Sequence, residues 1–150
     1  MANTAGLCTS FKVELMTADH NFGVSSATRG STAADSFKMA LYAPAGSIGP
    51  STTAYTATNE VTSSGYTAGG AAVTNATVPT SSGTTAYWTP SASVSWTTVT
   101  FTTDCALLYN SSRSNKSVGS YTFASQTVTA GNFTLTMPTN AAGTALIQIA

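Results

Sequence analysis

The sequence contains few charged residues. Five of its 150 residues are Lys or Arg and five are Asp or Glu, so the net charge is zero. Together they make up 7% of the chain, against about 25% in an average globular protein. No basic run is present, which excludes an electrostatic footprint for nucleic acid. A neutral surface repels other copies only weakly, which is typical of a chain packed against other proteins. A Thr-rich secreted domain kept soluble by its hydroxyls would have the same composition.

Long apolar runs are also missing. No apolar stretch approaches the roughly 18 residues that indicate a transmembrane helix, so we expect no contact with a membrane. The N-terminal stretch MANTAGLCTSFKVEL lacks the basic segment and apolar core of a signal peptide. We therefore expect the chain to be made and folded in a cytoplasm.

Groups that could catalyse a reaction or bind a metal are scarce. The one histidine, His20, has Asp19 beside it but no second metal ligand nearby, and no G-x-S-x-G motif accompanies it. Glu14 and Asp19 are expected on the solvated face of a helix. Asp35 and Asp104 each precede a strand, where Asp commonly bonds to turn backbone. The sequence therefore predicts a protein that is not an enzyme and needs neither a metal nor a cofactor.

The two cysteines, Cys8 and Cys105, lie far apart in the sequence. Sequence alone does not decide whether they form a disulfide, and we expect two buried free thiols. The apolar run 105–109 is continuous, as in a strand that is buried on both faces.

Threonine and serine are abundant, with 29 and 20 copies. Threonine is β-branched and suits a pleated, half-buried surface. Gly- and Pro-rich turns separate about eight short strands at a spacing of roughly 8–12 residues. We therefore predict an all-β fold, an antiparallel β-sandwich of jelly-roll or immunoglobulin-like type. It would span residues 25–150 and follow a short N-terminal helical segment, 1–24. The expected strands are 35–43, 71–78, 84–89, 94–101, 105–109, 121–128, 133–137 and 145–149, with turns at 81–83 and 129–132.

One segment has helical periodicity. Leu7, Phe11, Leu15, Ala18 and Phe22 are spaced by three or four residues, which places them on one helical face. This apolar stripe must be buried, either against one end of its own sheet or on another chain. Phe11, Leu15 and Phe22 are therefore candidate contacts with a partner.

The stretch SASVSWTTVTFTTDCALLYN contains a change of phase. Val94 and Trp96 share one face by alternation, and so do Val99 and Phe101, but the alternation slips by one residue at 97–98. Such a slip would turn every later side chain to the other face. We expect a β-bulge or sharp bend there, with Trp96 in the core.

Two further groups are candidates for recognition. Six tyrosines are spread along the chain and could stack on sugars, although tyrosine is also an ordinary strand residue with a polar tip. Arg113 and Lys116 place two of the five cations on one loop. That loop would contact an acidic partner or simply be solvated.

Several stretches are familiar when taken in order. They are HNFG, DSFKMALYAP, TTAYTATNEVTSSGYTAGG, ALLYNSSRSNKSVGSYTF and QTVTAGNFTLTMP. This series resembles a family of small structural proteins of tailed-bacteriophage virions. The resemblance covers most of the chain, and its motifs are strands and turns without an active-site marker.

The resemblance implies a location in the virion, after assembly in the host cytoplasm. It implies a capsid-associated cement or decoration protein that stabilises the shell through subunit contacts. The expected partners are the major capsid protein and other copies of the chain, which would form a homo-oligomer on the particle. The alternative is a tail or fibre module that binds a host surface glycan.

Overall fold

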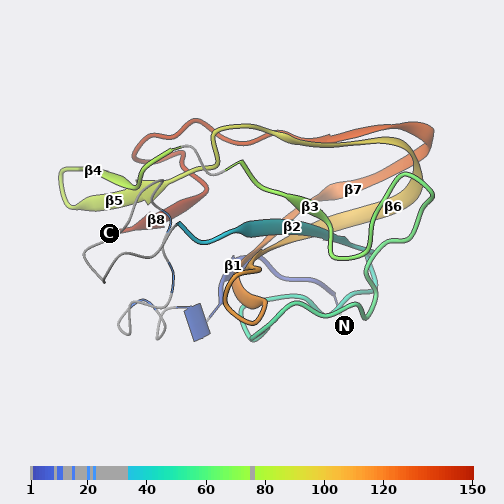
Figure 1. Cartoon of the computed structure of the whole chain (residues 1–150), viewed down its shortest axis with the longest axis horizontal. Coiled ribbons are helices and arrows are strands. Elements are labelled where there is room, and N and C mark those ends of the chain that lie inside the picture. Colours follow the sequence, from blue (N-terminus) through green and yellow to red (C-terminus); the bar gives the residue numbers. More distant parts are fainter. Residues whose placement is uncertain are drawn as a thin grey trace.

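The computed structural model describes residues 2–8, 10–11, 15, 20, 22, 34–74 and 77–150. These residues form two antiparallel sheets (Figure 1), which confirms the predicted all-β sandwich. The larger sheet has the strand order β1-β7-β6-β2-β3 and the smaller one β4-β5-β8. The strands are β1 (Gly6–Leu7), β2 (Phe37–Tyr42), β3 (Ala71–Ala72), β4 (Thr80–Ser82), β5 (Thr85–Trp88), β6 (Val94–Asn110), β7 (Lys116–Leu135) and β8 (Ile147–Ile149).

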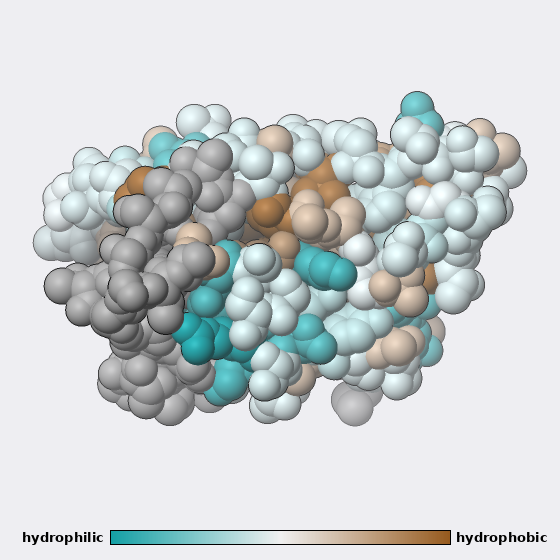
Figure 2. All heavy atoms as spheres, in the orientation of Figure 1, coloured by the Kyte–Doolittle hydropathy of each residue, from teal (hydrophilic) through white to brown (hydrophobic). Residues whose placement is uncertain are grey.

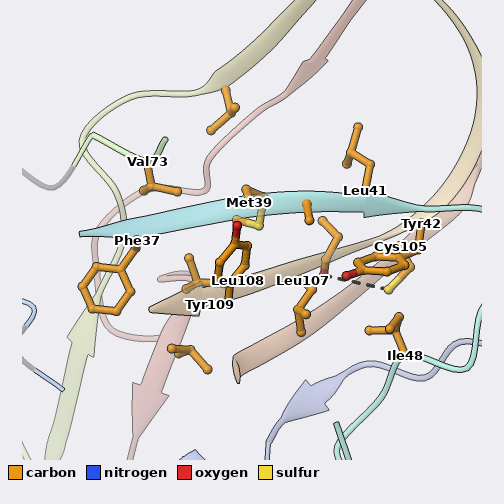
Figure 3. Packing of buried hydrophobic residues seen from close by; sticks show 14 of the residues in the cluster. Phe37, Met39, Leu41, Tyr42, Ile48, Val73, Cys105, Leu107, Leu108 and Tyr109 are labelled. Atoms are coloured by element: carbon orange, nitrogen blue, oxygen red, sulfur yellow. Dashed lines mark hydrogen bonds between the residues drawn. The ribbon is translucent and has the colours of Figure 1, made fainter. Parts of the chain in front are cut away.

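The core lies around the middle of the larger sheet. β6 and β7 form a long hairpin, and β2 pairs with the second half of β6, placing Met39 opposite Leu108. The run 105–109 is buried throughout, as its continuous apolar sequence predicted. Figure 3 shows Leu41 and Tyr42, neighbours in β2, pointing to opposite sides of the strand. The central strands are therefore covered on both faces.

The phase change in β6 is a β-bulge, as predicted. The register with β7 shifts between Trp96 and Val99, and Thr98 has a φ of 55°. The backbone N–H of Thr100 donates to Ser63 Oγ at 2.8 Å, which ties a neighbouring loop to the bulge. The bulge returns the later side chains to the core, and Trp96 is buried, as expected.

The predicted turn at 129–132 is wrong. β7 runs through it without a break, and a one-residue register shift next to Ala130, whose φ is 47°, accommodates the extra residue. The predicted turn at 81–83 is also displaced, because Ser82 pairs with Thr85 and leaves a two-residue hairpin loop. That loop begins with Gly83 at a φ of 58°, a conformation that favours glycine.

The start of the chain belongs to the larger sheet. Leu7 lies in β1 opposite Gly119, so it is not part of a helix. Asn3 donates from Nδ2 to Asp104 Oδ1 at 2.7 Å. The expected boundary between residues 1–24 and 25–150 therefore does not separate residues 2–8 from the sandwich. Ser10, Phe11 and Leu15 have helical backbone, His20 and Phe22 do not, and the other residues of the expected helix after Leu7, Ala18 among them, lie outside the described residues.

The visible surface is of intermediate hydropathy over most of its area. Most of the face in Figure 2 is pale, because Thr, Ser and Gly lie near the middle of the hydropathy scale, and small apolar patches interrupt it. Among the described residues, no helix has the length and apolarity needed to cross a membrane.

Candidate interaction site

An apolar pocket of about 140 Å³ lies between the N-terminal segment and the smaller sheet. Ala86 and Trp88 of β5 alternate onto one face of that sheet, and so do Ile147 and Ile149 of β8. These four residues form one wall. The remaining described lining residues are Phe11, Leu15, Phe22, Pro79 and Tyr87. An apolar cavity of about 150 Å³ holds a molecule the size of benzene, so the pocket has room for one large apolar side chain.

Phe22 connects the N-terminal segment to both sheets. Its ring stacks on Phe37 of β2 with centroids 4.6 Å apart, and it lies 4.8 Å from the ring of Trp88. Trp88 is fixed in turn, because its Nε1 donates to the carbonyl oxygen of Thr77 at 3.1 Å. The pocket therefore has an aromatic wall held by two sheets.

Phe11 is fully buried beside this wall. Its ring makes edge contacts with Phe22 and with His20, at centroid distances of 5.9 and 4.9 Å. The structure thus brings Phe11, Leu15 and Phe22 together around one pocket, although Phe22 is not helical. It also places them against the chain's own sandwich, which favours the first of the two expected roles for the apolar stripe.

Arg113 and Lys116 lie away from the pocket lining. Arg113 Nε contacts Asp35 Oδ1 at 3.3 Å, and Asp35 Oδ2 accepts a hydrogen bond of 2.8 Å from Asn110 Nδ2. The charge of Arg113 is therefore balanced within the chain. Lys116 begins β7, and its side chain is half-buried. His20 Nδ1 lies 3.1 Å from Asn110 Nδ2, which joins this polar cluster to the region around Phe11.

Two tyrosines share a single carboxylate that was not among the predicted site residues. Glu60 accepts hydrogen bonds of 2.7 Å from both the Tyr55 and the Tyr66 hydroxyl, and one of 2.8 Å from the Gly69 N–H. Tyr55 also stacks on Tyr109, with centroids 5.0 Å apart. Burial, helped by the Glu60 charge, raises the pKa of Tyr109 to about 12.

This arrangement leaves few tyrosines for stacking on sugars. Tyr42, Tyr66 and Tyr109 are buried in the core. Their buried positions fit the simpler of the two expected roles, in which tyrosine is an ordinary strand and packing residue. One feature of the sequence could have drawn attention to Glu60: it is the only carboxylate between Asp35 and Asp104.

Both cysteines are buried thiols that form no disulfide, as predicted. Burial, and the neighbouring Asp104 charge to a lesser extent, raises the pKa of the Cys105 thiol to about 12. The thiolate is the reactive form of cysteine, so this side chain is inert near neutral pH. Within the described ranges, no group of three or more His, Cys, Asp or Glu side chains could hold a metal ion.

Comparison with protein-family models, with curated proteins and with solved structures finds no match to this chain.

Proposed function

We propose that this chain is a structural protein of a tailed-bacteriophage virion, bound to the capsid as a cement or decoration protein. The observation that carries the proposal is the apolar pocket, whose described lining contains no charged residue. Such a pocket suits an apolar side chain of a neighbouring shell subunit. The family resemblance of the sequence and the very low charge of the chain support the same role.

The proposed role is mechanical. A cement protein buries surface at the joints between subunits, and many modest contacts add up because the copies are held in a symmetric array. It requires no reacting group and no cofactor. The glycan-binding alternative has less support, because the core holds three of the six tyrosines.

A particle-binding experiment tests this function. Shells of the phage that encodes the chain, prepared without the protein, are mixed with the purified wild type, and bound copies are counted. We expect a saturating, shell-like stoichiometry of hundreds of copies, which cryo-electron microscopy would place between subunits. A handful of copies located on the tail would contradict the proposal and favour the alternative.

One substitution tests the role of the pocket. Ala86 is exposed at the pocket, so Ala86→Glu places a charge there without disturbing the core. We expect at least a tenfold weaker affinity for shells, about 1.4 kcal/mol, with an unchanged melting temperature. The matched control is Ala142→Glu, an exposed position in a turn away from the pocket. Equal binding by the two variants would show that the pocket does not meet the shell.

A further inference from the structure

The outer strands of the two sheets differ in how well they are protected from pairing with another chain. An open strand edge presents unpaired N–H and C=O groups, and natural proteins blunt such edges with prolines, charges, bulges or very short strands. β1 and β3 have two residues each. β7 extends far beyond β1, and bulges interrupt it there: its pairing with β6 shifts register on both sides of residues 126–128. Pro79 directly precedes β4. β8 is short but has no bulge, proline or charge.

The hairpin between β4 and β5 determines which main-chain groups of β8 face outward. A two-residue loop requires Ser82 and Thr85 to form a hydrogen-bonded pair. By alternation, Trp88 directs its main-chain groups toward β8, where it pairs with Ile147. The next residue, Gln148, therefore directs its N–H and C=O away from β5, toward the open side of the sheet.

Exposed apolar surface and a groove adjoin β8. Ile149 is 45% exposed, and it is one of two large hydrophobic side chains exposed among the described residues, the other being Val78 at 54%. A groove of about 360 Å³ separates Leu146 and Gln148 from β1 of the larger sheet. Because Gln148 alternates with Ile147 and Ile149, this groove lies on the face of the smaller sheet opposite the apolar pocket.

The charge pattern favours a second copy as the occupant. Lys116 carries the last charged side chain, so residues 117–150, which include β8 and its surroundings, have no charged side chain. Two such surfaces meet without repulsion and without leaving a buried charge unpaired. An antiparallel pair of identical strands also has two-fold symmetry, which is the commonest symmetry of homo-oligomers.

We propose that two copies of this chain associate through β8, which pairs antiparallel with β8 of the second copy about a two-fold axis at Gln148. The two smaller sheets then form one six-stranded sheet. This proposal does not rest on the virion function.

The pairing is chemically complementary. The two Gln148 residues, one from each copy, exchange N–H···O=C bonds because their main-chain groups face each other. Ile147 of one copy lies opposite Ile149 of the other, and side chains in such pairs come within about 4.5–5.5 Å of each other. Both isoleucines lie on the pocket side of the sheet, so the exposed Ile149 is covered and the apolar wall of each pocket is extended.

Sedimentation of the full chain over a concentration series tests the proposal. We expect the average mass to rise from the monomer value of 15.2 kDa toward twice that value. Gln148→Pro removes the outward N–H but no bond to β5. An edge strand tolerates proline at a position whose N–H faces solvent. We expect this variant to remain monomeric. Gln148→Ala is the matched control, because it loses the same side chain but keeps the N–H, and it should associate like the wild type.

A second pair of variants keeps the test decisive if Gln148→Pro fails to fold. Ile149→Lys introduces a charge at the pairing edge, whereas Val78→Lys introduces the same charge at the other exposed hydrophobic position. We expect at least a tenfold weaker association for Ile149→Lys only, with circular dichroism like that of the wild type. A wild type that stays monomeric at millimolar concentration would overturn the proposal, and so would a folded Ile149→Lys variant that associates normally.

Discussion

Phe11 allows a direct measurement of whether the N-terminal apolar stripe serves the fold or a partner. Its side chain is fully buried and packs against the rings of Phe22 and His20. Replacing a buried phenylalanine by alanine removes its transfer free energy and leaves a cavity, at a cost of about 3–5 kcal/mol. In a chain of this size, 1 kcal/mol lowers the melting temperature by about 2–4 °C. We therefore expect Phe11→Ala to melt about 6–20 °C below the wild type.

Thermal and urea unfolding, followed by circular dichroism, would measure this loss. Val78→Ala is the control, because Val78 is largely exposed and its truncation should change stability by less than about 0.5 kcal/mol. A Phe11→Ala variant that melts within about 1 °C of the wild type would refute the burial argument. If that variant also failed to bind particles, Phe11 would be a partner contact rather than a core residue.

Two further predictions concern packing and thiol chemistry. Gly65→Ala should destabilise by about 1–3 kcal/mol or more, because a Cβ atom at Gly65 would lie 2.0 Å from the carbonyl oxygen of Thr97 in the bulge. Gly83→Ala is its control in urea unfolding, because a Cβ atom at Gly83 meets open space and only the positive φ disfavours alanine. A Gly83→Ala variant less stable than Gly65→Ala would contradict the clash. Cys8 and Cys105 should not react with a thiol reagent at pH 8 until the protein is unfolded, and rapid labelling of the native protein would contradict their burial. Because the pKa of Cys105 is raised in the folded chain, its thiol loses its proton at a lower pH in the unfolded chain. The stability that the protonated Cys105 thiol contributes should therefore be complete below about pH 9 and lost as the pH rises toward 12.

The sequence predicted those features that depend on neighbouring residues. The slip in alternation after Trp96 located the bulge in β6, because one extra residue in a strand is visible in the apolar pattern itself. The continuous apolar run 105–109 likewise predicted a strand that is covered on both faces. The all-β class followed from the abundance of β-branched threonine.

Features that depend on distant residues were not predicted. Leu7 fitted a helical stripe, but its pairing with Gly119 in β7, more than a hundred residues away, determined its conformation. The sequence 129–132 has the composition of a turn, and a bulge at Ala130 uses the same kinds of residue. Nothing local indicated that Trp88 and Ile147 would share the wall of a pocket, because separate strands carry them.

The position of β2 affects how the chain can fold during synthesis. β2 pairs with the second half of β6, for example through Met39 and Leu108, so its main partner is made about 70 residues later. At about 5–20 residues per second, the ribosome takes about 4–14 seconds to add those residues. Throughout that interval the apolar segment FKMALY has emerged without its partner, and Lys38 is its only charged residue. Translation speed between residues 42 and 105 should therefore determine how much of the protein aggregates as it is made.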